Sequence, residues 1–209
     1  MLGLFKNPVE LLYMTPAVII ALSFHELAHA AAAYRLGDRT AYNQGRLTAN
    51  PFAHIDILGL LMLYVAGFGW AKPVPINPYN FRGNRDHGVI LVSLAGPASN
   101  FIMAVLATIL LGAFAYNIPY LDRITQYIIY INVILAIFNL LPIPPLDGSK
   151  ILAGLIPGSQ EWMYKLEQYG LIILILLLVT NIIPKILGLF IGPVYQLLIW
   201  LAGTVNSVF

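Results

Sequence analysis

The chain has 209 residues, of which 59% are hydrophobic and 10% are charged, and its formal net charge is +2. Soluble domains carry about 25% charged residues, so this composition excludes an ordinary soluble domain and predicts an integral membrane protein. The absence of cysteine excludes disulfide bonds and cysteine-ligated metal sites. The sequence contains no cluster of basic residues that would indicate a nucleic-acid partner. We expect the lipid bilayer to surround the chain.

The first predicted element is a membrane-spanning helix over residues 9–35, long enough to cross a hydrocarbon core of about 30 Å. Residues 25–29 within it read His-Glu-Leu-Ala-His, the H-E-x-x-H arrangement. Residues four apart share one face of a helix, so His25 and His29 can reach one metal ion, and Glu26 can act as general base. Ionisable groups inside a membrane are costly, so we predict a metal site here rather than polar contacts between helices.

Two loops follow, separated by a short apolar run. Residues 36–57 form a polar loop, and residues 72–87 form a second loop that is rich in proline. The apolar run at 58–71 is shorter than the roughly 20 residues of a spanning helix, so it predicts a re-entrant segment. His54 and Asp56 are rival metal ligands in the first loop. The simpler interpretation of this loop is that it is interfacial and that Asp56 caps the next segment.

Four further apolar segments follow these loops: 88–115, 124–141, 169–183 and 186–203, the last two separated by Pro184-Lys185. We therefore predict an all-α polytopic membrane protein with a three-helix catalytic core, a re-entrant segment and additional C-terminal membrane helices. We expect a single membrane-embedded domain over residues 1–209. Its core covers about residues 9–150, and its C-terminal helices cover about residues 169–203.

A catalytic zinc usually has three protein ligands and one open position, and the two histidines supply two of the ligands. Asp147 is the candidate third ligand, because it follows the proline-rich residues 142–146 at the end of the third span. Prolines end the helix and bend the chain there, which can return Asp147 to the depth of the histidines. Irregular backbone at that depth is tolerated where it lines a cavity. A later glutamate, Glu161 or Glu167, is the alternative third ligand.

The distribution of Lys and Arg predicts the orientation in the membrane. If residues 58–71 return to the side they came from, only Lys6, Arg123 and Lys185 face one side. Eight basic residues then face the other: Arg35, Arg39, Arg46, Lys72, Arg82, Arg85, Lys150 and Lys165. This asymmetry places the N-terminus outside and the active site toward the cytoplasm. We expect a multi-pass protein of a prokaryotic plasma membrane.

Three motifs carry a resemblance to a known family. They are His-Glu-Leu-Ala-His at 25–29, Gly-Pro-Ala-Ser-Asn at 96–100 and Asn-Leu-Leu-Pro-Ile-Pro-Pro-Leu-Asp-Gly at 139–148. Together they resemble the site-2 proteases, which are intramembrane zinc metalloproteases, over about residues 9–150. Residues 69–78, Gly-Trp-Ala-Lys-Pro-Val-Pro-Ile-Asn-Pro, resemble the short subgroup without PDZ or CBS domains.

The resemblance implies one Zn²⁺ per chain, held by His25, His29 and Asp147, with Glu26 as general base. It places Asn139 near the metal, where it would help to bind the substrate or the oxyanion. It implies hydrolysis of peptide bonds within or next to transmembrane segments of substrate proteins. The implied substrates are single-span regulators or remnants of signal peptides.

Further roles follow from the same resemblance. Asn100 and the Gly96-Pro97 pair are expected to pack the middle helix against the active site. A separate hypothesis comes from the proline- and glycine-rich segments at 59–78, which are candidates for the strand or loop that pairs with an unwound substrate by edge addition. Two alternative functions stay open: a catalytically idle protein of the same fold that binds membrane helices, and a membrane zincin whose third ligand is a glutamate.

Overall fold

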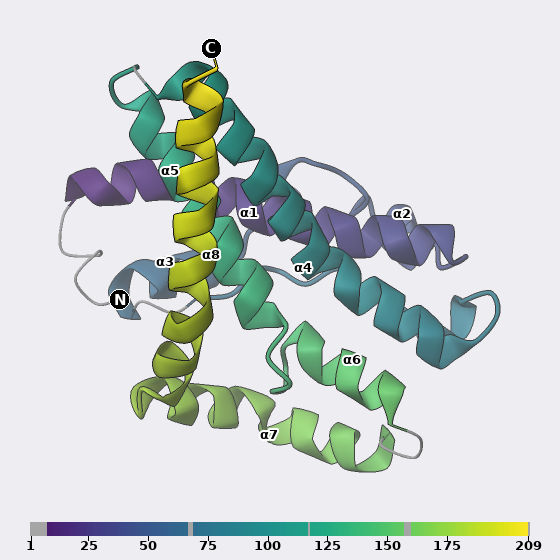
Figure 1. Cartoon of the computed structure of the whole chain (residues 1–209). Helices are drawn as coiled ribbons and strands as arrows, with labels where there is room; N and C mark the ends of the chain where they lie inside the picture. The colour runs from purple at the N-terminus through teal and green to yellow at the C-terminus, as the bar shows by residue number, and fades with distance from the viewer. Residues whose placement is uncertain (1–7, 67–68, 117, 157–159, 209) are drawn as a thin grey trace.

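The computed structural model describes residues 8–66, 69–116, 118–156 and 160–208, and these are mostly helical (Figure 1). Their helices are α1 (Pro8–Arg35), α2 (Thr40–Asn43), α3 (Ile57–Ala66), α4 (Arg85–Leu110), α5 (Leu121–Asn139), α6 (Asp147–Leu155), α7 (Gln160–Val179) and α8 (Ile182–Asn206). A π-helical turn, Leu111–Ala115, extends α4, and Pro51–Ala53 and Pro78–Asn80 form single 3₁₀ turns. Four helices, α1, α4 with its extension, α5 and α8, are long and apolar enough to cross a membrane. The predicted all-α polytopic fold is confirmed.

The three motif-bearing segments pack together as the predicted three-helix core of α1, α4 and α5. Small residues line the contacts: Ala17 and Ala21 on α1 and Ala104 on α4 are completely buried. Small side chains let helix backbones approach closely, which compensates for the weak hydrophobic driving force between helices in lipid. α8 closes the core from the other side of α4 and α5, where Ile129 and Ile183 are completely buried.

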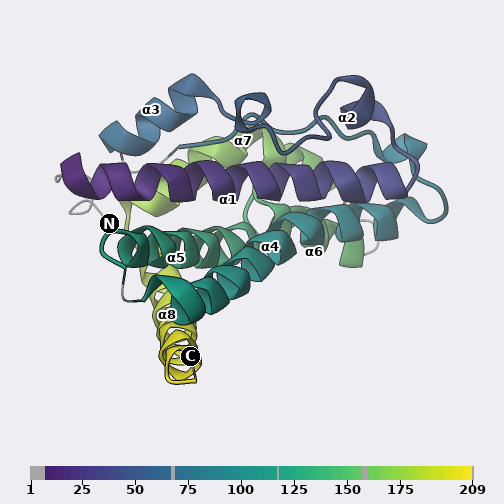
Figure 2. The same ribbon diagram turned by 90° about the horizontal axis from the view of Figure 1, so that it is seen from above.

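α3 has ten residues and lies along the N-terminal half of α1 (Figure 2). It is not among the helices long enough to cross a membrane, as expected for a segment that does not span. Tyr64 Oη lies 2.6 Å from Thr15 Oγ1 and ties α3 to α1. A Cβ atom on Gly59 would collide with the carbonyl oxygen of Trp70, so the returning chain passes directly against the start of α3.

The predicted break between the last two helices is in the wrong place. α7 begins already at Gln160 and ends at Val179, and the chain turns at Asn181, whose φ of 58° is left-handed. Asparagine tolerates this conformation better than most residues. Pro184 lies in the first turn of α8, where its missing N–H costs nothing because the first turn has no intrahelical acceptors. α8 then runs crosswise to α1 in Figures 1 and 2.

Candidate metal centre

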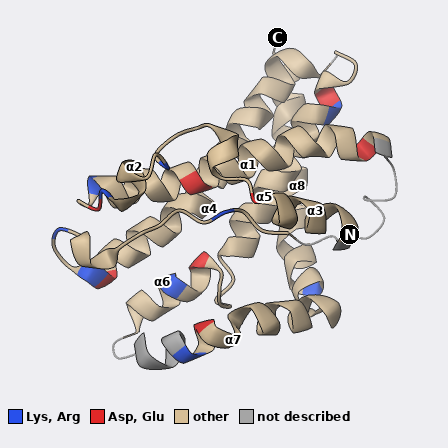
Figure 3. Ribbon diagram, turned by 180° about the vertical axis from the view of Figure 1, so that it is seen from behind, with Lys and Arg blue, Asp and Glu red and all other residues tan. Residues whose placement is uncertain are grey.

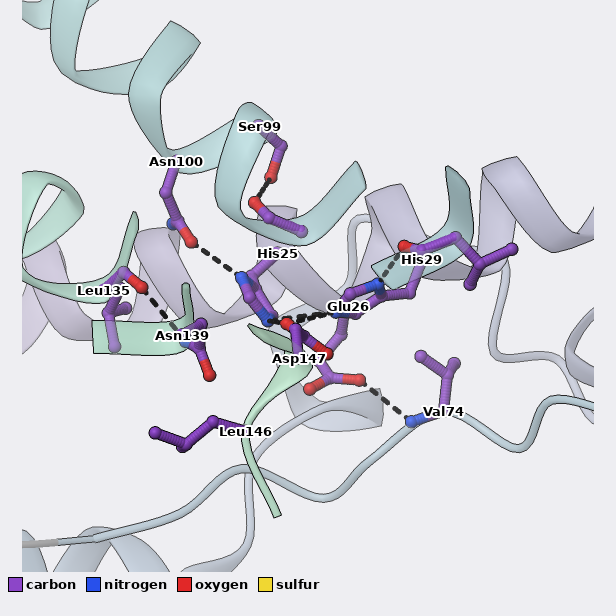
Figure 4. A network of polar contacts seen from close by, with 12 residues as sticks. His25, Glu26, His29, Val74, Ser99, Asn100, Leu135, Asn139, Leu146 and Asp147 are labelled. Carbon is purple, nitrogen blue, oxygen red and sulfur yellow. Dashed lines mark hydrogen bonds and ion pairs between the residues drawn. The ribbon is translucent and has the colours of Figure 1, made fainter. Parts of the chain in front are cut away.

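The ligand atoms of three predicted residues converge between α1 and the start of α6 (Figure 4). His25 and His29 lie one turn apart on α1, and their Nε2 atoms are 3.0 Å apart. After α5 ends, the chain turns back through the proline-rich residues 140–146 and begins α6 at Asp147. Oδ2 of Asp147 then lies 3.2 Å from both Nε2 atoms. All three side chains are buried.

The hydrogen-bond partners of the two imidazole rings direct both Nε2 atoms toward Asp147. Nδ1 of His25 lies 2.7 Å from Oδ1 of Asn100, and Nδ1 of His29 lies 2.7 Å from the carbonyl oxygen of Val92. Both oxygens are acceptors, so each Nδ1–H donates, and each Nε2 of the neutral ring presents a lone pair. Oδ2 of Asp147 is buried without a hydrogen-bond partner. Three lone pairs therefore face one another, an arrangement that a metal ion would stabilise.

The distances fit zinc. Zinc–nitrogen and zinc–oxygen bonds of about 2.0–2.2 Å place tetrahedral ligand atoms roughly 3.3 Å apart. The three separations of 3.0, 3.2 and 3.2 Å are within a few tenths of an ångström of this value. Two imidazoles and one carboxylate are a common donor set for catalytic zinc, with a fourth position left open. Among the described residues, this is the one group of three or more candidate ligands that converges.

Gly96 allows α4 to approach the histidines. A Cβ atom at this position would collide with Nε2 of His29, and it would lie 2.5 Å from Cε1 of His25. The glycine therefore lets the α4 backbone come close enough for the carbonyl of Val92 to accept from His29 and for Asn100 to accept from His25. The family resemblance implied that the 96–100 motif packs its helix against the site, and the contacts of Gly96 agree with this expectation.

Glu26 is buried beside the cluster, and Oε2 accepts a hydrogen bond of 2.9 Å from the backbone N–H of Val74. Val74 belongs to an extended segment, residues 71–77, whose backbone passes close to Glu26 (Figure 4). This contact holds the carboxylate next to the predicted ligands. It joins residues 48 positions apart and involves only a backbone group of Val74, so the sequence carries no signal for it.

The site opens into a cavity of about 640 Å³. The histidines, Glu26 and Asp147 form one wall, and the segment 71–77 forms another. The end of α5, the beginning of α6 and the middle of α7 complete it. A cavity of this size holds a stretch of extended peptide, as a protease requires.

Comparison with known proteins identifies the family. A match to peptidase family M50 covers residues 116–181. The "Putative zinc metalloprotease YwhC" of Bacillus subtilis is 44% identical over 183 residues, which are 83% of this chain and 83% of the relative. The chain belongs to peptidase family M50. The "Putative zinc metalloprotease Rip2" of Mycobacterium tuberculosis is 33% identical over 189 residues, 86% of this chain and 70% of the relative.

A more distant relative is "Zinc metalloprotease MJ0392" of Methanocaldococcus jannaschii, 23% identical over 201 residues, which are 91% of this chain and 50% of that protein. No solved structure matches the chain significantly. Membership of family M50 confirms the resemblance to the site-2 proteases. The protein is a multi-pass membrane metalloprotease with zinc as its cofactor.

Within this M50 protein, the rival ligands lie apart from the cluster. His54 is completely buried, and its Nε2–H donates to the carbonyl of Thr48 at 2.8 Å. Asp56 accepts from the N–H of Gly59 and so caps α3, as the simpler interpretation of this loop predicted. Glu167 is exposed on α7, and the side chain of Glu161 lies outside the described residues.

Asn139 lines the cavity at the end of α5. Its Nδ2 donates to the carbonyl of Leu135 in its own helix at 3.1 Å, and Figure 4 shows its oxygen pointing away from that carbonyl. The structure thus places Asn139 beside the cluster but not among the ligand atoms. Its role toward substrate stays a prediction.

The polar support behind His25 extends further than the sequence analysis foresaw. Nδ2 of Asn100 donates to the carbonyl of Ala21 at 3.0 Å and to Oδ1 of Asn132 at 2.9 Å, which fixes the amide with its oxygen toward His25. Asn100 and Asn132 are completely buried. A metal-ligating histidine usually donates a hydrogen bond from its second ring nitrogen to such an acceptor. The asparagines within the apolar helices α4 and α5 were therefore the sequence signal for this support.

Proposed function

We propose that this M50 metalloprotease is of the site-2 type and hydrolyses peptide bonds within or next to the transmembrane segments of its substrates. The observation that carries the proposal is the depth of the site. His25 lies ten residues before the end of α1 at Arg35, which is about 15 Å along a helix that is apolar enough to span. A site at that depth can act on a peptide bond that is itself in the membrane.

In this mechanism His25, His29 and Asp147 would hold the zinc. When bound, zinc acts as a Lewis acid that polarises the scissile carbonyl and lowers the pKa of water to about 7. Glu26 removes a proton from the attacking water and delivers it to the leaving amine. The N–H of Val74 keeps the Glu26 carboxylate in place at 2.9 Å. We propose that Asn139, which lines the cavity, hydrogen-bonds the substrate or the oxyanion.

The extended segment 71–77 is the proposed guide for an unwound substrate, and the hydrogen bonds that it already makes limit how it can pair with one. The N–H of Lys72 donates to the carbonyl of His54, and that of Asn77 donates to Asp38. Pro73 and Pro75 have no N–H to give. We therefore propose that the segment accepts hydrogen bonds from substrate N–H groups through its carbonyls, rather than forming a full ladder of reciprocal bonds.

We further propose that the active site faces the cytoplasm. In Figure 3 most of the basic residues lie at the α2 end of α1, at the start of α4, on α6 and on the first part of α7, at one end of the molecule. The opposite end carries the Glu10–Arg123 ion pair at 3.2 Å. The excess of Lys and Arg on cytoplasmic loops supports this orientation. The proposed substrates are single-span membrane regulators or remnants of signal peptides.

The test uses the protein in nanodiscs with labelled single-span peptides whose helices contain a Gly-Pro or Asn-Pro break. Wild type, Glu26→Gln and the matched control Glu167→Gln, on the exposed face of α7, are compared. We expect cleavage inside or beside the peptide's apolar stretch by wild type and Glu167→Gln, mapped by mass spectrometry. We expect a loss of at least about 100-fold in Glu26→Gln, as general bases contribute about 10²–10⁴-fold.

Zinc per chain is measured on the same samples and on His25→Ala and Asp147→Ala. Full zinc in Glu26→Gln with no cleavage would support the proposed roles. Cleavage that persists in Glu26→Gln, or cleavage confined to soluble peptides such as casein fragments, would contradict the proposal. Equal binding of the peptides by wild type and Glu26→Gln, with no cleavage by either at full zinc, would favour the idle helix-binding protein.

A further inference from the structure

A second cavity, of about 150 Å³, lies between the N-terminal half of α1, α3 and α5. Its walls are almost entirely apolar and include Val18 on α1, Leu60 and Leu63 on α3, and Ile131 and Ile134 on α5. The one charged residue in the lining is Asp56, whose Oδ1 accepts from the backbone N–H of Gly59 at 2.8 Å. Water therefore finds little to bind in this cavity, and an apolar group is the fitting occupant.

This apolar cavity adjoins the cavity of the metal site. Leu22, Gly69, Trp70 and Leu135 line both. Leu22 lies one helical turn before His25, and Leu135 lies one turn before Asn139. The two cavities are therefore neighbours, so the apolar cavity lies within a side chain's distance of a peptide held beside the metal.

The wall that α3 contributes is held in place by polar contacts and close packing. Tyr64 binds Thr15 across to α1 at 2.6 Å, and Asp56 caps the first turn of α3. The backbones around Gly59 and Gly69 touch, because a Cβ on Gly69 would collide with the carbonyl oxygen of Gly59. The cavity is thus framed by contacts that need no occupant, as expected of a preformed binding site.

We propose that this cavity is a specificity subsite that binds one large apolar side chain, of leucine or phenylalanine size, from a substrate residue next to the scissile bond. The inference rests on the proposed proteolytic function. An apolar protein cavity of about 150 Å³ stays dry and binds a benzene-sized group. A cavity of 150 Å³ here matches one such side chain and is too small for a second helix. The subsite would select where along an apolar segment the chain is cut.

The experiment compares Leu60→Trp, which fills the cavity, with Leu61→Trp, the next residue on α3, whose side chain is 56% exposed. The substrates are single-span peptides in nanodiscs that carry Ala, Leu or Phe at each of the four positions around the cut. We expect wild type and Leu61→Trp to prefer Leu or Phe over Ala at one position by at least about tenfold in kcat/KM. We expect Leu60→Trp to lose that preference while it still cleaves the Ala peptide.

Two results would overturn the subsite. One is an unchanged preference in Leu60→Trp. The other is an equal loss for all peptides with one zinc per chain retained. Failure of the proposed function looks different, because wild type with full zinc would then cleave no peptide of the series.

A second readout does not depend on turnover. Peptides with photo-leucine at the same four positions are irradiated in complex with Glu26→Gln, and the adducts are mapped by mass spectrometry. Adducts from one position onto Leu60, Leu63 or Ile131 support the subsite. Adducts only on residues outside the cavity, or only with lipid, would overturn it, since an acyl chain would then be the occupant.

Discussion

At the scale of single residues, the support behind the ligands matters as much as the ligands. Asn100 accepts from Nδ1–H of His25 at 2.7 Å and thereby directs the lone pair of Nε2 toward His29 and Asp147. The sequence indicated the three ligands through spacing and a turn motif. It placed Asn100 only in a packing role, because a hydrogen bond between residues 75 positions apart follows no local pattern.

Replacing Asn100 by alanine should therefore weaken zinc binding by about 10–100-fold, the usual effect of losing such a partner. The affinity is measured by competition with a chromogenic chelator on purified protein. Ser99→Ala is the control, because the Ser99 hydroxyl donates to the carbonyl of Gly96 and does not contact a histidine. Zinc affinity that is equal in Asn100→Ala and wild type would show that Asn100 does not orient His25.

A second residue-scale prediction concerns Asp38, in the loop directly after α1. Burial by itself raises the pKa of this carboxyl, but hydrogen bonds from Asn80, Thr40 and the N–H of Asn77 outweigh it and hold the pKa below its usual value. A lowered pKa in the folded state stabilises the protein above the unfolded-state pKa of about 3.9, and this contribution is lost as the pH falls through the folded value.

We therefore expect Asp38→Asn to lower the Tm in detergent at pH 6–7, where the carboxylate of the wild type is charged. The difference from wild type should shrink as the pH falls below about 4. Thermal unfolding followed by intrinsic fluorescence between pH 3 and pH 7 measures it. A difference in Tm that is constant over this range would contradict a charge-dependent role of Asp38.

At the scale of elements, the site depends on how closely α1 and α4 approach. Sequence alone placed the three motifs on three spans and predicted that the proline-rich turn after α5 returns Asp147 to the histidines. It did not predict the contact of the segment 71–77 with Glu26, since a chain with Pro73 and Pro75 has no strand-like alternation to recognise. Tertiary contacts of isolated backbone groups are the part of this site that local patterns do not encode.

Gly96→Ala tests the closeness of the two helices. The added methyl group would collide with Nε2 of His29, so α4 must move away and take the carbonyl of Val92 and Asn100 with it. We expect less than one zinc per chain and a lower Tm. Gly188→Ala on α8 is the matched control, because a Cβ there meets nothing within 4 Å. The control should keep its zinc and gain slightly in stability, by up to about 1 kcal/mol.

Normal zinc content and Tm in Gly96→Ala would mean that α1 and α4 accommodate the added methyl group without loss of zinc binding or stability. The close contact at this position would then not be needed to hold the ligands. Replacement of a helical glycine by alanine raises helix propensity in general. The comparison with Gly188→Ala separates this gain from the effect of the close contact at Gly96.

At the scale of the whole molecule, hydropathy and length identified the spans, but the break between α7 and α8 depended on local backbone chemistry. Pro184 indicated a break, and the chain instead turns three residues earlier at Asn181. The predicted membrane orientation depends on whether residues 58–71 cross the membrane. If they do not span, as the short α3 indicates, the basic residues gather on the side of the active site.

Because the chain contains no cysteine, single-cysteine variants report orientation without background. Arg39→Cys lies in the exposed loop after α1, and Ile118→Cys lies between α4 and α5 with its native side chain 48% exposed. With a membrane-impermeant maleimide on intact bacterial spheroplasts, we expect Ile118→Cys to react at once and Arg39→Cys to react only after permeabilisation. The reverse pattern would place the site on the outer face. Equal labelling of both before permeabilisation would mean that these two loops lie on the same side and that the span count is wrong.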